Sequence, residues 1–299
     1  MTRALVVNGD DFGLTPGVNA GILAAHLGGI LTSASLFANA GATDEAIRIA
    51  AATPTLGVGC HLTLADGDPV LPPLSLPTLA PGGRFRPTWT SFIRAAMAGR
   101  IALAEIEREL TAQIDRVRSA GITPTHLDAH KHVHAYPPVF DVVARLARRF
   151  RIRAVRVPCE DSPFTLMARY SAIPRAGRQA MENLALLPWS RADRRTLARY
   201  GLPASPRFLG RALTGVFTAR RLQSMLRRVA HGVSELMSHP GYPDAALSTV
   251  RTRLRLERAR EVELLTSPET IDFVVREGLV LMRHDGVLSH HSFVNRYAS

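Results

Sequence analysis

The sequence predicts an α/β fold: a distorted, complete or incomplete, TIM-like (β/α) barrel of about seven parallel strands. Two observations predict it. Short apolar runs alternate with helix-like stretches along the chain, as in βαβ units. The 299 residues are 46% hydrophobic and 21% charged, which is enough for one barrel-sized core. We therefore expect one domain over residues 1–299, interrupted by two insertions.

The first βα unit is the clearest. The apolar run Ala4-Leu5-Val6-Val7 indicates a buried strand, and Thr15-Pro16 suits the N-cap and first position of a helix that Gly28 ends. In the stretch 103–120, apolar residues recur every three or four positions, as on one face of a helix. The predicted strands, in order, are Leu5–Asn8, Ser33–Ala38, Gly57–Leu64, Thr125–His130, Arg153–Val157, Ser234–His239 and Leu279–Arg283. The predicted helices are Thr15–Gly28, Asp44–Ala52, Leu103–Ala120, Val139–Arg149 and Pro268–Glu277.

Two stretches interrupt this alternation. Asp66–Arg100 is rich in proline and glycine, which predicts a long loop, and long loops in compact domains are often lids. Glu160–Gly232 is arginine-rich and partly helical. Neither stretch has the composition of a separate domain with its own core.

The net charge of +12 is carried almost wholly by arginine, since Lys131 is the only lysine. Two interpretations stay open: codon bias in a GC-rich genome, or attraction to an anionic surface. A nucleic-acid partner is not expected, because aromatic residues make up only 6% of the chain and no binding motif is present. A cytoplasmic protein is expected, because no spanning segment or signal pattern is visible. Cys60 and Cys159 form no CxxC pair and are expected to be reduced and buried.

Two adjacent carboxylates, Asp10 and Asp11, follow the first predicted strand and precede a helix start. In α/β folds, ligands bind at the carboxyl ends of the strands. The alternative is that both residues only form a turn, a common role for aspartate.

Histidines close three further strands and favour the first interpretation. A single histidine at a strand end is more often structural, so the argument depends on their convergence at one edge. His130, His132 and His134 would share one face of a continuing strand, or only one or two would point inward if the chain turns at Lys131. The polar residues that collect at this edge are Asp10, Asp11, His61, Asp128, His130, His132, His134 and His239.

One carboxylate and two imidazoles form a recurring divalent-metal site with open positions. Such an ion lowers the pKa of bound water and polarises a carbonyl oxygen. A second carboxylate can accept the proton of the water, and a histidine across the site can protonate a leaving group. The set therefore fits metal-assisted hydrolysis.

The sequence resembles the YdjC-like carbohydrate deacetylases in four ordered blocks. These are Asn8–Gly13, Gly59–Thr63, Thr125–His134 and Ser238–Tyr242. The resemblance implies a distorted barrel, one divalent ion and hydrolysis of an N-acetyl group on a sugar. It matches Asp11, His61 and His130 to the metal ligands, Asp10 to the base and His239 to the acid. Asp128, His132, His134 and Asn39 are expected around the metal or at the substrate.

Several motif variants, among them Val155-Arg156-Val157-Pro158, look most like the hopanoid-biosynthesis-associated branch of that family. This implies an N-acetylglucosaminyl hopanoid as substrate, with the arginine-rich insertion and the cluster of Trp89, Phe92 and Ile93 at the inner membrane surface. The other expected partners are the N-acetyl sugar itself and a second copy of the chain in a homodimer. An ordinary lid and a solvated face are the simpler interpretation of the same residues.

Three alternatives stay open: a deacetylase of soluble chitooligosaccharides or another N-acetyl sugar, a non-catalytic sugar- or metal-binding barrel, and a metal-dependent phosphoesterase. An apolar extension of the cleft favours a lipid tail, and an open aromatic-lined groove favours a soluble glycan. Histidine and aspartate ligands suit zinc, while magnesium needs more oxygen ligands, so the cofactor is one Mg or Zn ion.

Overall fold

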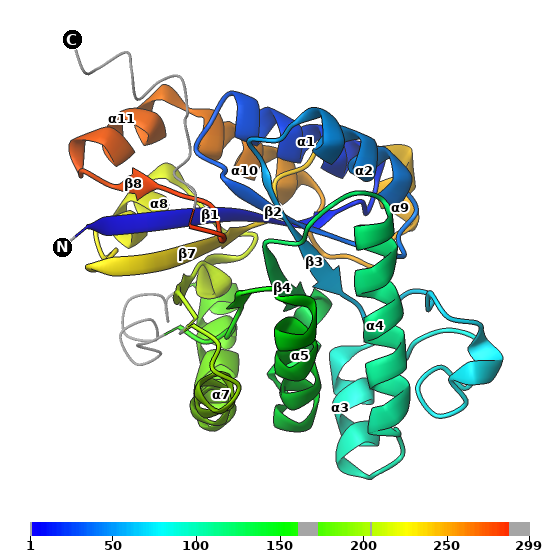
Figure 1. Ribbon diagram of the computed structural model, residues 1–299. Helices are drawn as coiled ribbons and strands as arrows, with labels where there is room; N and C mark the ends of the chain where they lie inside the picture. Colours follow the sequence, from blue (N-terminus) through cyan, green and yellow to red (C-terminus); the bar gives the residue numbers. More distant parts are fainter. Residues whose placement is uncertain (1, 161–172, 204, 287–299) are drawn as a thin grey trace.

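The described residues form one sheet of eight parallel strands. The sheet curls into an open half-barrel (Figure 1). The computed structural model describes residues 2–160, 173–203 and 205–286. The strand order is β5-β4-β3-β2-β1-β7-β6, and β8 pairs with the start of β1. The strands are β1 (Arg3–Phe12), β2 (Ser33–Leu36), β3 (Gly57–Leu62), β4 (His126–Ala129), β5 (Ala154–Val155), β6 (Arg207–Leu209), β7 (Gly232–Ser238) and β8 (Val280–Leu281). The predicted incomplete barrel is confirmed, because β5 and β6 end the sheet without pairing in the described part of the chain.

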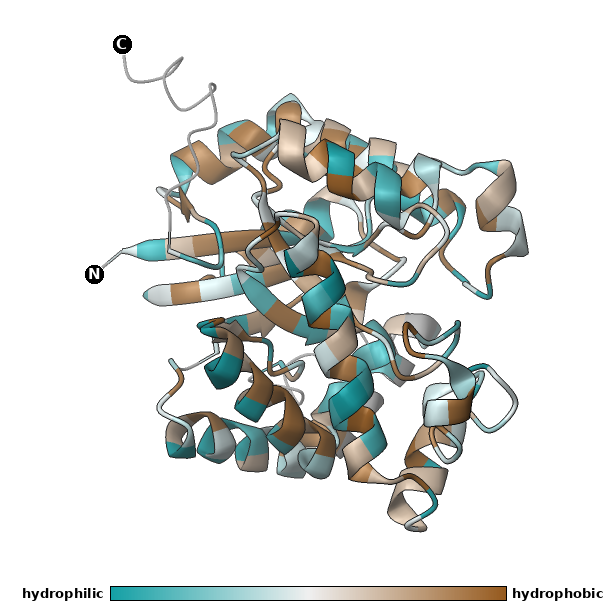
Figure 2. Ribbon diagram, turned by 45° about the vertical axis from the view of Figure 1, so that its right-hand side comes forward, coloured by the Kyte–Doolittle hydropathy of each residue, from teal (hydrophilic) through white to brown (hydrophobic). Residues whose placement is uncertain are grey.

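The helices cover the outside of the half-barrel in two groups, α1, α2, α10 and α11 along one side and α4, α5 and α7 along the other (Figure 1). Figure 2 shows apolar residues along the strands and mixed apolar and polar residues along the helices, as expected for amphipathic helices on a core. The α-helices of the described residues are α1 (Pro16–Leu27), α2 (Thr43–Ala52), α3 (Trp89–Met97), α4 (Leu103–Ser119), α5 (Pro137–Phe150), α7 (Pro174–Arg199), α8 (Ala219–Leu226), α9 (Ala245–Thr249), α10 (Leu256–Thr266) and α11 (Pro268–Arg276). The same residues include the 3₁₀ helices η1 (Pro73–Ser75), η2 (His130–Ala135) and η3 (Arg211–Leu213).

The local signals of the first helix act as predicted. Thr15 is the N-cap of α1 and accepts a hydrogen bond from the backbone N–H of Val18, and Pro16 occupies the first turn. In α4 the predicted apolar stripe is buried from Ile106 to Val117, which attaches that helix to the sheet, whereas its first residue, Leu103, is 47% exposed.

The first strand is longer than predicted. β1 continues to Phe12 because it is paired along its length with β7, β8 and β2, so Asp10 and Asp11 lie within the strand rather than in a turn after it. Its register with β2 shifts between Gly9 and Phe12, and Asp11 there has a φ of 70°. Such a bulge re-aims a side chain at the end of a strand.

The second predicted insertion contributes to the barrel. Its segment Arg207–Leu209 forms β6, which no sequence pattern predicted, because three residues are too few to show a period. Pairing with β7 stabilises this short strand. The residues 161–172 and 204 of the same stretch lie outside the described part of the chain.

The interior of the half-barrel is polar, whereas a closed barrel usually fills its centre with branched apolar side chains. Glycine is needed at position 59 because a Cβ there would lie 2.4 Å from the ring of His126. Buried polar residues come from six neighbouring segments: Asn8, Asp10, Ser35, His61, His126, Asp128, Arg156 and Glu235. Burial of this many charged groups is costly unless each is paired, so the interior is organised for chemistry rather than for stability.

The first insertion begins with a loop whose two ends are hydrogen-bonded to each other, and α3 follows it. We call the paired ends, residues 66–67 and 85–86, the neck of the insertion. The backbone N–H of Asp66 donates to Arg86, and that of Phe85 donates to Gly67, at N–O distances of 2.8 and 3.0 Å. Neither cysteine forms a disulfide and both are buried, as predicted. Within the described residues, no helix is long and apolar enough to cross a membrane.

Candidate metal and active site

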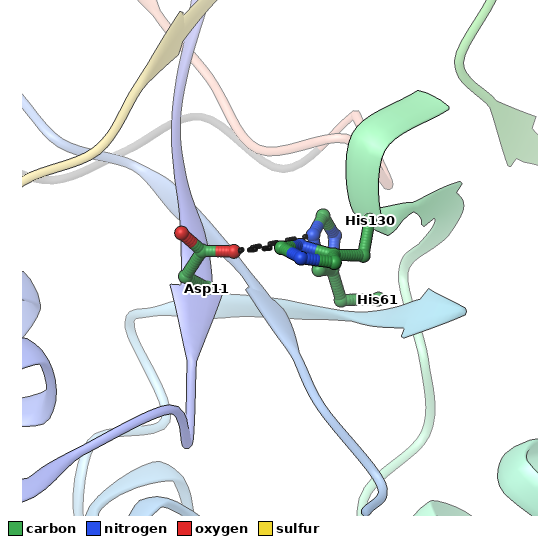
Figure 3. Close-up of side chains that lie close together, drawn as sticks. All are labelled: Asp11, His61 and His130. Atoms are coloured by element: carbon green, nitrogen blue, oxygen red, sulfur yellow. Dashed lines mark hydrogen bonds and ion pairs between the residues drawn. The ribbon is translucent and has the colours of Figure 1, made fainter. Parts of the chain in front are cut away.

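Three side chains matched to metal ligands lie together at the carboxyl edge of the sheet (Figure 3). Asp11 comes from β1, His61 from β3 and His130 from the start of η2. Their candidate ligand atoms all lie within 4.8 Å of one another. The Oδ1 atom of Asp11 is 3.5 Å from Nε2 of His61 and 3.2 Å from Nδ1 of His130. One carboxylate oxygen between two imidazole nitrogens is a donor set that suits a divalent cation.

The chain turns immediately after His130. Lys131 and His132 both have a φ of 54°, a left-handed conformation that ends the strand direction. The expectation of a turn at Lys131 therefore holds, and only His130 of the three alternating histidines joins the cluster. The ring of His132 lies edge-on to Phe208, with 5.9 Å between centroids.

His134 has a structural setting. Its Nε2 atom lies 2.9 Å from the backbone oxygen of Arg156, and its ring stacks on Phe140. It supports the segment that carries Arg156 rather than facing the metal cluster.

Asp128 orients the ring of His61. Its Oδ1 atom lies 2.8 Å from Nδ1 of His61, which leaves Nε2 of that ring facing Asp11. The other oxygen accepts from Ser35 at 2.8 Å and lies 2.6 Å from Arg156. A carboxylate behind a ligating histidine fixes the tautomer and orientation of the ring.

Asp10 is held by an arginine whose role the sequence analysis missed. Arg156 donates to both carboxylate oxygens of Asp10 at 2.7 Å, and Asn8 donates to one of them at 2.8 Å. The Nε atom of Arg156 also donates to Glu235 at 2.7 Å. Arg156 stood out in the sequence only as part of a motif variant. Several buried carboxylates at one edge need a positively charged partner, and this requirement is the signal that could have identified Arg156.

Negative charge exceeds positive charge in this buried cluster. Four carboxylates, Asp10, Asp11, Asp128 and Glu235, face two guanidinium groups, Arg156 and Arg258. One divalent cation would neutralise the excess. The residues therefore fit a divalent metal both in ligand chemistry and in charge.

The pKa values of Asp11, His61 and His130 depend on burial and on the charges beside them. Burial alone would lower the pKa of His61, but Asp128 and Asp11 raise it to about 10. Burial alone would raise the pKa of Asp11, but Arg258 and the two histidines hold it well below its usual value. For His130, burial outweighs Asp11 and lowers the pKa. For His61 and Asp11 the neighbouring charges thus outweigh burial, and for His130 they do not.

His239 follows β7 at the same edge. Burial lowers the pKa of its ring to about 4, although Asp10 and Asp11 act in the opposite direction. Its backbone N–H donates to Glu261 at 2.6 Å. The Nδ1 atom of His239 is buried and has no hydrogen-bond partner among the described residues.

A cleft of about 850 Å³ opens beside His130. Its walls come from the ends of β1–β3, the neck of the first insertion and the segment 246–255. Asn39 lines it and donates to the backbone oxygen of Asp68 at 2.6 Å, and Lys131 contacts Asp66 of the same wall at 2.5 Å. More than half of the lining residues are polar or charged: Thr15, Asn39, Thr63, Asp66, Asp68, Arg84, His130, Ser248, Thr249, Arg251 and Arg255.

Fold and site together define an α/β half-barrel with an Asp-His-His centre of the kind that holds a divalent ion. The chain belongs to the YdjC-like protein family, whose model matches residues 4–276. It is 34% identical over 287 residues to a carbohydrate deacetylase of Geobacillus stearothermophilus, covering 95% of this chain and 98% of that one. It is 31% identical over 269 residues to a chitooligosaccharide deacetylase of Klebsiella pneumoniae (strain 342), covering 89% and 92%. A solved structure from Enterococcus faecalis V583, described as a putative cellobiose-phosphate cleavage protein, matches with a TM-score of 0.77 and 26% identity over 95% of this chain and 98% of that one.

Proposed function

We propose that this protein is a metal-dependent carbohydrate deacetylase that hydrolyses the N-acetyl group of an N-acetylated amino sugar. The observation that carries the proposal is the Asp-His-His cluster with a second carboxylate, Asp10, directly adjacent to it in the chain and a cleft of about 850 Å³ opening beside it. The names of the two relatives, carbohydrate deacetylase and chitooligosaccharide deacetylase, support the same activity.

Asp11, His61 and His130 would hold the ion through Oδ1, Nε2 and Nδ1. When bound, a divalent ion supplies Lewis-acid polarisation of a carbonyl and a lowered pKa for water. Two nitrogen donors favour zinc over magnesium, which prefers oxygen ligands.

Asp10 accepts the proton of the attacking water in this proposal. Arg156 holds both oxygens of Asp10, so the carboxylate cannot rotate away from the centre. His239 is the residue proposed to deliver a proton to the amine as the C–N bond breaks. Because the pKa of His239 is lowered to about 4, its ring is neutral near pH 7. The proton that His239 delivers is therefore the one that Asp10 first removes from water.

For the substrate, the polar cleft supports a glycan more than a hopanoid tail. Its lining includes Phe37 and Phe85 but no residue of the second insertion in the described part of the chain. The apolar residues between the arginines of that insertion, such as Leu222, Met225 and Leu226, are core residues at most 2% exposed. Phe92 and Ile93 are also buried. We therefore favour a soluble N-acetyl sugar such as a chitooligosaccharide, with the sugar-linked hopanoid as the alternative.

The test measures acetate released from chitobiose and from an N-acetylglucosaminyl hopanoid in the same detergent, with and without chelator. We expect acetate from chitobiose, loss of activity with chelator and recovery with zinc. Better kcat/KM on the hopanoid would restore the lipid assignment. Sugar binding without acetate release from any N-acetyl substrate would instead support the non-catalytic barrel.

A further inference from the structure

Helix α10 contacts two parts of the proposed site, Asp11 and the backbone of His239, through side chains one turn apart. Arg258 donates through Nη2 to Oδ2 of Asp11 at 2.5 Å. Glu261 accepts the backbone N–H of His239 at 2.6 Å. Both side chains are buried, at 1% and 3% exposure, on a helix of otherwise ordinary composition. Neither residue belongs to the sequence blocks that carry the family resemblance.

We propose that α10 is a positioning element of the active site, in which Arg258 fixes the Asp11 carboxylate for the metal and Glu261 fixes the strand end that carries His239. The inference depends on the proposed function for the roles of Asp11 and His239. It adds two positioning residues that touch neither the ion nor the substrate.

The Arg258 contact divides the carboxylate of Asp11 between two tasks. Oδ2 is occupied by the guanidinium, and Oδ1 alone faces His61 and His130. Asp11 therefore offers the ion one oxygen instead of two. The left-handed backbone of Asp11 persists only where the surroundings hold it, and Arg258 is one of the groups that do so.

Arg258 is itself fixed. Its Nε atom donates to the backbone oxygen of Leu254 at 3.1 Å, and its own backbone oxygen accepts from Gly241 at 3.3 Å. A Cβ at position 241 would lie 3.3 Å from Cδ of Arg258, so the segment after His239 passes close to this side chain. The same short segment thus links the arginine to the strand end that carries His239.

The Glu261 contact acts on the backbone of His239 rather than on its ring. The N–H of His239 comes directly after β7, where strand pairing ends, and a buried donor there needs an acceptor. Glu261 supplies that acceptor. Without it, the residue after the strand loses its anchor, and a proton donor displaced by about 1 Å loses much of its effect.

The two contacts predict separable effects. Loss of a residue that orients a metal ligand typically weakens metal affinity or activity by about 10–100-fold. Arg258→Met should therefore weaken zinc affinity by about 10–100-fold, and Arg258→Lys should restore part of it. Glu261→Met should lower kcat at least about tenfold at unchanged zinc affinity, and Glu261→Gln, whose amide oxygen still accepts the N–H, should retain most of the activity.

The experiment measures zinc affinity by calorimetry, and kcat and KM for chitobiose, in these four variants. The exposed residues Arg260 and Glu263 of the same helix provide the matched controls Arg260→Met and Glu263→Gln. A merely structural role would give equal losses of thermal stability with no division between metal affinity and kcat. Unchanged or tighter zinc binding in Arg258→Met, or weaker zinc binding in Glu261→Met, would overturn the inference.

Asp11→Asn separates this inference from the proposed function. If Asp11→Asn binds zinc as tightly as the wild type, Asp11 is not a ligand and the proposed site fails. If Asp11→Asn loses zinc while Arg258→Met keeps it, the site stands and the positioning role of α10 is wrong. Both readouts are obtained without turnover.

Discussion

Arg156 donates to both carboxylate oxygens of Asp10, with Nη1–Oδ2 and Nη2–Oδ1 distances of 2.7 Å. The same guanidinium reaches Asp128 and Glu235 at 2.6 Å. Planar guanidinium groups suit such bidentate contacts better than lysine does. One side chain therefore pairs with three buried carboxylates behind the cluster of Asp11, His61 and His130.

The first prediction concerns this arginine. Arg156→Met should destabilise the fold by about 3–5 kcal/mol, because it leaves buried carboxylates without their partner. Arg156→Lys should lose less, since it keeps the charge but not the bidentate geometry. Urea unfolding monitored by circular dichroism measures both. The exposed Arg153→Met is the matched control, and an equal loss in that variant would contradict the argument.

The second prediction concerns the proposed base. Asp10→Asn should retain zinc, because Asp10 is not among the three ligand atoms proposed, but its turnover should fall by about a hundredfold or more. Zinc content by mass spectrometry and acetate release under saturating substrate measure the two effects. Full turnover by this variant would remove Asp10 from the mechanism.

The third prediction concerns the choice among the histidines. His61→Ala should lose zinc binding, whereas His132→Ala should keep it, because the ring of His132 lies against Phe208 and away from the cluster. Calorimetric titration with zinc compares the two proteins directly. If His132→Ala also loses the ion, the assignment of His130 as the third ligand needs revision.

The fourth prediction concerns the wall of the cleft. Lys131 and Asp66 are about a quarter exposed and lie 2.5 Å apart. This contact joins the turn after His130 to the neck of the first insertion. Lys131→Met and Asp66→Asn should each raise KM for chitobiose several-fold, with a smaller change in kcat. A double-mutant cycle should give a coupling of about 0.5–1 kcal/mol, as for other partly exposed pairs. Additive effects in that cycle would rule out the coupling.

The fifth prediction concerns pH. Burial lowers the pKa of His134 to about 4, against 6.5 for the free side chain, so the unfolded chain binds a proton more readily than the native protein. Stability contributed by neutral His134 is therefore present above pH 6.5 and is lost as pH falls toward 4, by about 3 kcal/mol in total. The slope of unfolding free energy against pH should be shallower in His134→Gln. The exposed His231→Gln should keep the wild-type slope, and an unchanged slope in His134→Gln would contradict the prediction.

The local elements could be predicted because their signals are local. Thr15 and Pro16 define the start of α1, and the apolar stripe of α4 is visible in the sequence because its period is that of a helix. The collection of polar residues at one edge also followed from topology, since parallel strands all end on the same side. β6 could not be predicted, because a three-residue strand is stabilised only by its pairing with β7.

The sequence by itself determined the class of fold, a distorted, complete or incomplete barrel, and the carboxyl edge as the candidate site. Its resemblance to the YdjC-like deacetylases singled out Asp11, His61 and His130 as candidate ligands. Only the tertiary structure decided that Lys131 turns the chain and removes His132 and His134 from the cluster. It also decided that Arg156 and Arg258, 146 and 247 residues from their aspartate partners, pair with the buried carboxylates. The physical reason is that backbone period and capping depend on near neighbours, whereas charge pairing in a buried site depends on which distant side chains the fold brings together.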